Sequence, residues 1–193
     1  HSLSSAIKYL GVNTTISSKK DDLLQATHIF LPGVGSFKKA METIREKRID
    51  DVIRDIFFNS DIKLFGICLG MQLLGSYSEE DDGSEGLNLI GNKVTKFDHK
   101  TTKLKIPHVG FNKIVFDQDY KSTIFNDLSN ESYFYFVHSF KMNISPKLKN
   151  FATSFYGETF VSAFQQNNLV GTQFHPELSQ SNGMRLISNF LKL

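Results

Sequence analysis

Cys68 is the residue of this sequence with the clearest capacity for covalent chemistry. It is the only cysteine among 193 residues, and glycines lie two positions away on either side, at Gly66 and Gly70. A short apolar run over 62–67 predicts a strand, and residues 69–74 have the pattern of a helix. Strand, sharp turn and helix form a nucleophile elbow, in which the helix N-terminus favours a thiolate and free amides can hold an oxyanion. The alternative is a buried structural cysteine in a glycine-flanked turn.

A cysteine nucleophile needs a base, and the segment Thr172-Gln173-Phe174-His175-Pro176-Glu177 can supply one. The run 169–174 predicts a strand, and Pro176 biases His175 toward an extended conformation. Residues two apart in extended chain point to the same side, so Glu177 is placed to accept a hydrogen bond from the ring of His175. That bond would fix the tautomer and leave the other ring nitrogen for Cys68. The alternative is a surface turn with a satisfied histidine.

Pro32-Gly33-Val34-Gly35 follows another predicted strand. Two glycines allow a backbone amide to turn toward a bound group, which would make this loop a second oxyanion donor. The alternative is an ordinary glycine turn. In open α/β sheets, binding sites gather at the carboxyl ends of the strands. The three segments are therefore expected to meet in space although they lie far apart in the chain.

The elements that position these residues follow from the hydrophobic pattern. Short apolar strands alternate with amphipathic helices in the first half, which predicts an α/β fold with a doubly wound, mostly parallel sheet flanked by helices. We expect Leu23 and Leu24 on the buried side of one short helix, and Gly11 as the C-cap of another. The expected helices cover 3–10, 19–26, 37–46 and 50–58, and the expected strands cover 12–17, 28–31 and 62–67.

The second half of the chain predicts a different arrangement. Closely spaced apolar segments there indicate antiparallel hairpins or a second, smaller antiparallel sheet. A final helix over 184–193 carries Leu186, Ile187 and Phe190 on one face. The expected strands cover 93–97, 104–106, 111–116, 133–140, 151–155, 160–165 and 169–174.

Length and composition limit the classes of protein this can be. A chain of 193 residues can form one domain over 1–193, and 40% hydrophobic and 22% charged residues are ordinary for a globular protein. A net charge of +2 requires neither a nucleic acid nor a membrane as partner. A single cysteine excludes an internal disulfide and suits a reducing cytoplasm. No metal or cofactor is expected, and the sequence has neither a phosphate loop nor a dinucleotide fingerprint.

The start of the sequence is unusual, because it lacks a methionine and opens inside a predicted helix. The apolar residues of that helix need a sheet face to cover. We therefore expect roughly a dozen further residues before His1, forming a strand inside the sheet.

Several motifs together resemble a known family. Gly66-Ile67-Cys68-Leu69-Gly70-Met71-Gln72, with His175 and Glu177 in their segment, is similar to the class I (triad) glutamine amidotransferases. The remaining segments, which extend the resemblance over essentially the whole chain, resemble the glutaminase subunit of imidazole glycerol phosphate synthase: Pro32-Gly33-Val34-Gly35-Ser36-Phe37, Ile106-Pro107-His108-Val109-Gly110-Phe111-Asn112 and Tyr135-Phe136-Val137-His138-Ser139.

This resemblance implies roles for individual residues. Cys68 would attack the side-chain amide of glutamine to give a glutamyl thioester and ammonia, His175 would shuttle protons, and Glu177 would orient His175. The amide of Leu69 and those of the loop Gly33, Val34 and Gly35 would hold the oxyanion. The positions that match substrate-binding positions of the family are Gln72, Glu80, His138 and Ser139.

The resemblance also implies a partner, because ammonia must be delivered to an acceptor site that this chain is too short to contain. In the family, the partner is a (β/α)₈-barrel cyclase that forms a heterodimer and makes imidazole glycerol phosphate and an aminoimidazole ribotide. Segments 107–112 and 135–139 would then lie near the subunit interface. Phe111 stands where the family often has tryptophan.

Three other functions remain open at this stage. A paralogous glutaminase subunit could feed ammonia to a sugar-amidating enzyme that builds surface polysaccharide. A thiol hydrolase acting on γ-glutamyl peptides could use the same triad. A non-catalytic binding module could retain the fold.

Overall fold

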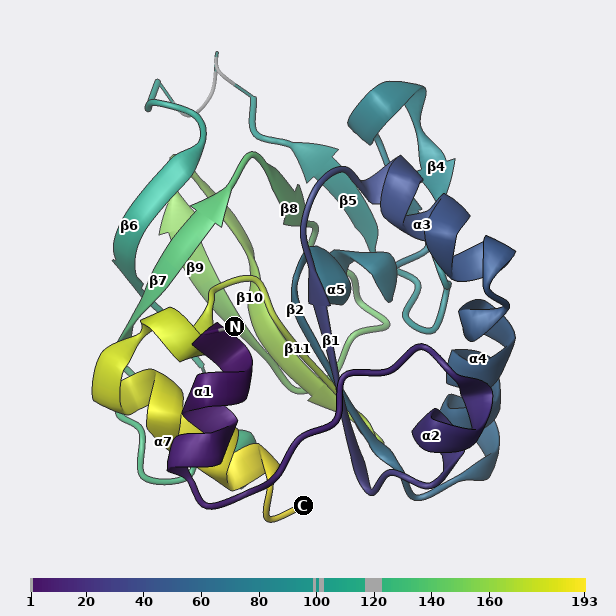
Figure 1. Ribbon diagram of the computed structural model, residues 1–193. Helices are drawn as coiled ribbons and strands as arrows, with labels where there is room; N and C mark the ends of the chain where they lie inside the picture. The colour runs from purple at the N-terminus through teal and green to yellow at the C-terminus, as the bar shows by residue number, and fades with distance from the viewer. Residues whose placement is uncertain (1, 99, 101–102, 117–122) are drawn as a thin grey trace.

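The computed structural model describes residues 2–98, 100, 103–116 and 123–193 (Figure 1). The strand expected before residue 1 lies outside these residues. The helices of the described chain are α1 (Ser2–Tyr9), α2 (Lys20–Leu24), α3 (Phe37–Glu46), α4 (Ile49–Asn59), α5 (Leu69–Leu73) and α7 (Gln180–Phe190), with 3-10 turns η1 (Glu80–Asp82), η2 (Thr123–Phe125) and η3 (Pro176–Leu178). The strands are β1 (His28–Gly33), β2 (Lys63–Cys68), β3 (Tyr77–Ser78), β4 (Ser84–Glu85), β5 (Lys93–Lys96), β6 (His108–Lys113), β7 (Tyr133–His138), β8 (Phe140–Met142), β9 (Phe151–Tyr156), β10 (Glu158–Gln166) and β11 (Leu169–Thr172).

One nine-stranded sheet runs through the molecule in the order β1-β2-β11-β10-β8-β5-β3-β4, with β9 paired to β10. Strands β1, β2 and β11 are parallel neighbours, and the antiparallel pairs begin where β11 meets β10. A separate antiparallel ribbon is formed by β6 and β7. The predicted fold class is confirmed: a sheet with a parallel portion is flanked by helices, and a smaller antiparallel sheet comes from the second half.

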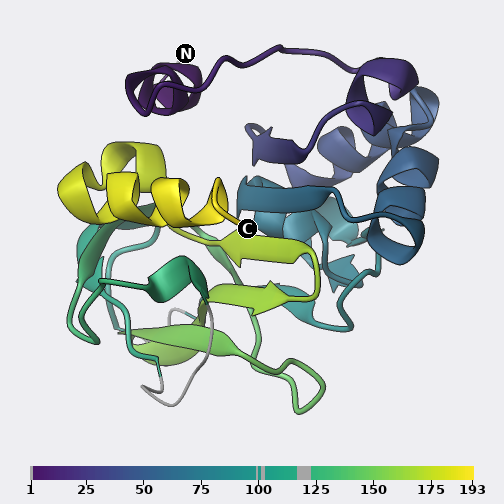
Figure 2. The same ribbon diagram turned by 90° about the horizontal axis from the view of Figure 1, so that it is seen from below.

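Strands β2 and β11 are buried on both faces, and alternate residues belong to different cores. Leu64 of β2 and Leu169 of β11 pack in one cluster with Phe37, Met41 and Ile53 of the helices on that face. Their sequence neighbours, Phe65 and Val170, pack in a second cluster with Leu186 and Phe190 of α7. Figures 1 and 2 show α3 and α4 on one side of these strands and α7 on the other. The period-2 alternation of side chains in the strands therefore builds two separate hydrophobic layers.

The helix spacings agree with this arrangement. In α3 the buried residues are Phe37, Met41 and Ile44, four and three positions apart, which puts them on one face. Helix α7 buries Leu186, Ile187 and Phe190, as the sequence predicts. Helix α1 packs its Ala6 and Ile7 against Ile187, and Figures 1 and 2 show it beside α7. Gly11 follows α1 with φ +81°, as expected for a C-cap.

Four predictions about the chain are wrong. The single strand expected over 133–140 is two strands, β7 and β8, which belong to different sheets. Residues 12–17 form no strand, and the described chain offers β1 no neighbour except β2. Residues 104–106 are also irregular; Pro107 lacks an amide for a ladder, and the strand begins after it at His108. Leu24 is exposed and α2 has no buried residue; the main helix that α2 contacts is α4.

Candidate active site

Cys68 is the last residue of β2 and comes directly before α5. Its backbone has φ 54° and ψ −110°, a strained conformation for a residue with a side chain and the one expected of a nucleophile elbow. Glycine is required on both sides because the strand and the helix nearly touch. A Cβ on Gly66 would lie 2.8 Å from backbone atoms of Gly70, and a Cβ on Gly70 would collide with the carbonyl oxygen of Leu31 in β1.

His175 lies close to Cys68 because β11 is the direct parallel neighbour of β2. Thr172 pairs with Ile67, so the two strands end at the same edge of the sheet. His175 Nδ1 lies 2.9 Å from Glu177 Oε1. Burial alone would lower the pKa of His175, but hydrogen bonds and charge interactions with Cys68 and Glu177 outweigh it and raise the pKa to about 10. The imidazole of His175 is therefore in its positively charged form at neutral pH, with the sulfur of Cys68 on one side and the carboxylate of Glu177 on the other.

The backbone of His175 is fastened to β7. Its N–H donates to the carbonyl of Tyr135 at 2.9 Å, and the Tyr135 N–H donates to Ser179 Oγ at 2.9 Å. The same hydroxyl donates to the carbonyl of His175 at 2.6 Å. Ser179 is 1% exposed, so water does not compete for these bonds. The position of the imidazole thus depends on β7 as much as on its own strand.

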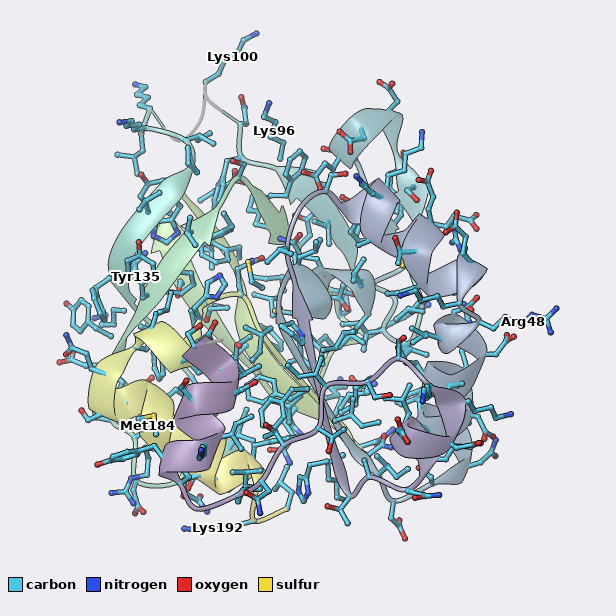
Figure 3. The ribbon with its side chains drawn as sticks, in the orientation of Figure 1. Arg48, Lys96, Lys100, Tyr135, Met184 and Lys192 are labelled. Carbon is cyan, nitrogen blue, oxygen red and sulfur yellow. The ribbon has the colours of Figure 1, made fainter. Side chains whose placement is uncertain are left out.

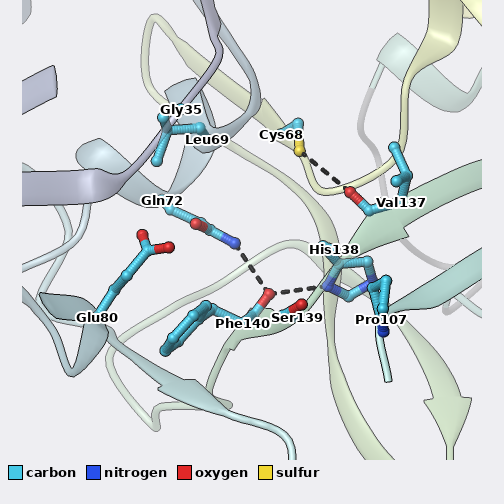
Figure 4. A pocket seen from close by; sticks show the side chains of 10 residues that line it. All are labelled: Gly35, Cys68, Leu69, Gln72, Glu80, Pro107, Val137, His138, Ser139 and Phe140. Carbon is cyan, nitrogen blue, oxygen red and sulfur yellow. Dashed lines mark hydrogen bonds between the residues drawn. The ribbon is translucent and has the colours of Figure 1, made fainter. Parts of the chain in front are cut away.

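A pocket of about 300 Å³ opens beside the thiol (Figure 4). Its wall is assembled from segments distant in sequence: the turn after β1, the start of α5, η1, the residue before β6, and the link from β7 to β8. The lining residues are Gly35, Cys68, Leu69, Gln72, Glu80, Pro107, Val137, His138, Ser139 and Phe140. Figure 4 shows the sulfur of Cys68 directed at the carbonyl of Val137, 3.9 Å away.

The four residues expected to hold an oxyanion lie around the elbow. Gly33 is the residue of β1 that pairs with Cys68, and a Cβ there would come within 2.6 Å of the Leu69 Cβ. Gly35 has φ +89° and lines the pocket, whereas the side chain of Val34 is 92% exposed. The backbone of this loop therefore lies at the pocket beside the elbow, and the side chain of Val34 lies in solvent.

Two glutamine side chains connect the pocket to the nucleophile. Gln72 Nε2 donates to the carbonyl of Phe140 and to Gln173 Oε1, both at 2.9 Å. Gln173 Nε2 lies 3.7 Å from Cys68 Sγ. Both hydrogens on Gln72 Nε2 are thus committed inside the protein, so Gln72 Oε1 is the atom left to accept a bond from a ligand.

The other expected substrate residues have different surroundings. Glu80 lines the pocket, and its Oε2 accepts a 2.7 Å bond from the N–H of Phe37, the first residue of α3. Ser139 lines the pocket as well. His138 lies at the pocket wall but is 6% exposed, and both of its ring nitrogens have partners inside the protein. It has no free ring nitrogen to offer a substrate.

Sequence reasoning assigned no role to Gln173 or the carbonyl of Phe140, and it expected Pro107 at the subunit interface rather than at the pocket. Gln173 could have been found from its spacing, because it lies two residues before His175 in a segment expected to be extended. The Phe140 carbonyl could not, because a backbone group carries no sequence signal. Among the residues that the structure describes, no group of three or more His, Cys, Asp or Glu side chains could hold a metal ion. No described helix is long and apolar enough to cross a membrane.

Comparisons with known proteins agree with this geometry. The sequence profile of the family described as glutamine amidotransferase class-I matches residues 1–193. The imidazole glycerol phosphate synthase subunit HisH of Escherichia coli (strain K12) is 38% identical over 193 residues, covering 100% of this chain and 93% of that protein. The HisH subunit of Chlorobaculum tepidum is 36% identical, covering 98% and 92%.

Solved structures show the same fold. A crystal structure of a glutamine amidotransferase superposes with a TM-score of 0.75 at 19% identity, covering 99% of this chain and 91% of that one. The glutaminase domain of Trypanosoma brucei CTPS, solved with bound acivicin, gives 0.65 at 18% identity, covering 99% and 87%. The match over the full length and the identity to HisH subunits mean that this chain belongs to the class-I glutamine amidotransferases, in the HisH family of imidazole glycerol phosphate synthase subunits.

Proposed function

We propose that this chain hydrolyses glutamine to glutamate and ammonia and passes the ammonia to a synthase partner. The observation that carries the proposal is the arrangement of Cys68, His175 and Glu177 beside a pocket in a chain of the HisH family. Nucleophile, proton carrier and orienting carboxylate come from three positions that the parallel strands β2 and β11 hold at one edge of the sheet. A free thiol must stay reduced, so the cytoplasm is the compartment that suits this chemistry.

The chemistry proceeds in two stages. Cys68 Sγ attacks the side-chain amide carbon of glutamine, and the negative charge on the amide oxygen is held by backbone N–H groups of Leu69 and of the loop around Gly35. His175 gives its proton to the amide nitrogen, which leaves as ammonia, and a thioester remains. His175 then takes a proton from water as the water attacks the thioester; the C–S bond breaks, glutamate is released, and the sulfur leaves as a thiolate beside the reprotonated His175. The carboxylate of Glu177 stabilises the imidazolium at each stage.

The pocket has groups suited to the far end of glutamine. Glu80 offers a carboxylate to the α-ammonium group, and its bond to the start of α3 holds it at the pocket wall. Gln72 Oε1 is free to accept a hydrogen bond, since its own amide hydrogens are bound elsewhere. Ser139, which also lines the pocket, can add a hydroxyl. These groups account for recognition of an amino acid rather than of any amide.

The outer face of the β6–β7 ribbon is the best candidate for the partner surface. Inward and outward residues alternate. Except for Lys113, the outward ones are apolar or aromatic and at least partly exposed: Val109, Phe111, Tyr133, Tyr135 and Val137. Val109 pairs with Val137, and the rings of Phe111 and Tyr135 meet edge to face at 5.6 Å. Figure 3 places Tyr135 at the edge of the molecule.

Val137 belongs both to this surface and to the pocket wall, so a docked partner would meet the pocket directly. We propose that the partner is a (β/α)₈-barrel cyclase and that the two chains form a heterodimer. Its reaction would use the ammonia to make imidazole glycerol phosphate and an aminoimidazole ribotide. Clustered exposed aromatic residues are typical of interface hot spots, which supports this assignment of the surface.

The test compares the wild-type chain with Cys68→Ala, each alone and with the cyclase subunit. Wild type should release glutamate, and Cys68→Ala should lose this activity by several orders of magnitude because no nucleophile remains. The variant should still bind the partner and support synthesis from added ammonia. Glutamate release by Cys68→Ala at a near-native rate would overturn the mechanism. Ammonia transfer to a sugar acceptor in place of the cyclase substrate would instead identify the sugar-amidating function, and release of glutamate from γ-glutamyl peptides would identify a thiol hydrolase.

A further inference from the structure

Two buried histidines link the β6–β7 ribbon to the pocket. His108 and His138 pair directly across the ribbon, and both rings point inward, with 2% and 6% of each residue exposed. His108 Nδ1 lies 2.9 Å from His138 Nε2. Neither ring is hydrogen-bonded to Cys68, and the mechanism above uses neither of them.

The partners of these rings define where each hydrogen lies. His138 Nδ1 is 2.8 Å from the carbonyl of Phe140, which can only accept, so this nitrogen carries the hydrogen. His138 Nε2 is then an acceptor in the neutral ring and takes the hydrogen of His108 Nδ1. His108 Nε2 in turn accepts from Asn112 Nδ2 at 3.3 Å. Every donor meets an acceptor only if both rings are neutral.

Burial favours the same neutral state. It lowers the pKa of His108 to about 4 and that of His138 to about 3. The charges that face His138 act in the same direction: His108, His175 and Lys141 each lower its pKa. A proton on either ring would place two N–H groups against each other in a dry site, which is costly.

This chain of hydrogen bonds continues to the nucleophile. The Phe140 carbonyl that accepts from His138 also accepts from Gln72 Nε2, as Figure 4 shows. Gln72 then bonds Gln173, whose amide nitrogen faces the sulfur of Cys68. The orientation of the Gln72 amide therefore depends on a carbonyl that His138 holds from the other side.

We propose that His108 and His138 are positioning residues for glutamine binding: by holding the Phe140 carbonyl, they fix which atom of the Gln72 amide faces the pocket. The inference rests on the proposed glutaminase function. Neither ring contacts the substrate, so their loss acts through Gln72. The competing explanation is that both rings only fill an aromatic core, since His108 stacks on Tyr156 with ring centroids 4.0 Å apart.

Two substitutions at one position separate these explanations. Asparagine places its amide nitrogen near the position of His138 Nδ1 and can still donate to the Phe140 carbonyl. Glutamine places its amide near the position of Nε2 and can still meet His108, but it leaves that carbonyl without its donor. We expect His138→Gln to raise the KM for glutamine about 3- to 10-fold, as for loss of one hydrogen bond, and His138→Asn to raise it less. His28 is a half-buried histidine at the start of β1 and takes no part in this network. His28→Asn is therefore the control and should leave KM unchanged.

If both rings only fill the aromatic core, another outcome is expected. Both substitutions remove a ring, so they should then lower the melting temperature alike and raise KM alike. Equal KM values for His138→Asn and His138→Gln would overturn the proposal. Since the comparison is between variants, an inactive wild type would count against the proposed function and not against this inference.

A second measurement does not depend on turnover. Side-chain amide NMR signals of ¹⁵N-labelled protein report the hydrogen bonds of Gln72, assigned through a Gln72→Glu variant. His138→Gln should shift these signals and His138→Asn should leave them nearer their wild-type positions. Unshifted signals in His138→Gln would refute the link between the histidine pair and the pocket.

Discussion

The buried histidine pair should make the protein sensitive to mild acid. In the folded state the pKa values of His108 and His138 are lowered to about 4 and about 3, whereas an unfolded chain has histidines near the ordinary value of 6.5. As the pH falls below 6.5, the unfolded chain takes up protons that the folded chain cannot. Stability is therefore lost from pH 6.5 downward, until the pH reaches the folded-state values.

The size of the effect follows from the width of this window. Each pH unit below 6.5 costs about 1.4 kcal/mol per histidine, so moving from pH 6.5 to pH 5 costs roughly 2 kcal/mol for each ring and roughly 4 kcal/mol for the pair. Both residues are buried, so screening by solvent does not reduce this loss of stability. A loss of this size is a large share of the 5–15 kcal/mol by which a domain is typically stable.

The assay is urea unfolding at pH 7 and pH 5, followed by circular dichroism because the chain has no tryptophan. Comparing wild type with His138→Asn isolates the contribution of His138 to the pH dependence of stability, because the contributions of groups present in both proteins cancel. His175 is among them: its raised pKa gives stability that is present below pH 6.5 and lost as pH rises toward 10. The variant should lose roughly 2 kcal/mol less than wild type between the two pH values, or about 1 M in the urea midpoint. An identical pH dependence in both proteins would show that His138 is not held neutral.

Two further predictions concern the elbow and the triad. Gly70→Ala should destabilise the fold by roughly 1–3 kcal/mol or more, since its Cβ would collide with the Leu31 carbonyl. Gly91→Ala is the control, because its Cβ would meet only the Lys147 side chain, at 3.8 Å. It should change stability little in a parallel denaturant titration. Glu177→Gln should lower turnover about 10²-fold, which is less than the loss caused by removing Cys68. It should also move the alkaline limb of the pH–rate profile to lower pH, because it removes a carboxylate that raises the pKa of His175. An alkaline limb that stays in place would contradict this role of Glu177.

The sequence predicted best those features that depend on local pattern. The bounds of α3 are as predicted, and the strand ending at Cys68 followed from an apolar run between helical segments. Cys68, His175 and Glu177 could be proposed as a triad because each part carries its own local signal: glycines around the cysteine, and a proline that keeps His175 extended. The structure brings these segments to one edge of the sheet. The two wrong strands, over 12–17 and 104–106, have suitable side chains but no neighbouring strand in the described chain, and strand formation depends on such a neighbour.

The pocket wall shows what local pattern leaves out. His138 was expected to contact substrate, yet its ring bonds His108 and the Phe140 carbonyl. The pairing of two histidines across a ribbon depends on the register of β6 and β7, which neither segment specifies alone. Contacts to backbone groups such as the Phe140 carbonyl are likewise set by tertiary packing.

The neighbouring positions of β2 and β11 also determine when activity can arise during folding. Cys68 ends β2 and His175 follows the adjacent strand β11, but most of the second half of the chain lies between them, including β10, which pairs along β11. Contacts of such long sequence separation form late, after the entropy of closing the loop has been overcome. A nascent chain that has made the elbow still lacks its base until the C-terminal strand docks. Glutamine hydrolysis thus reports completion of the sheet, and a truncated product would not waste glutamine.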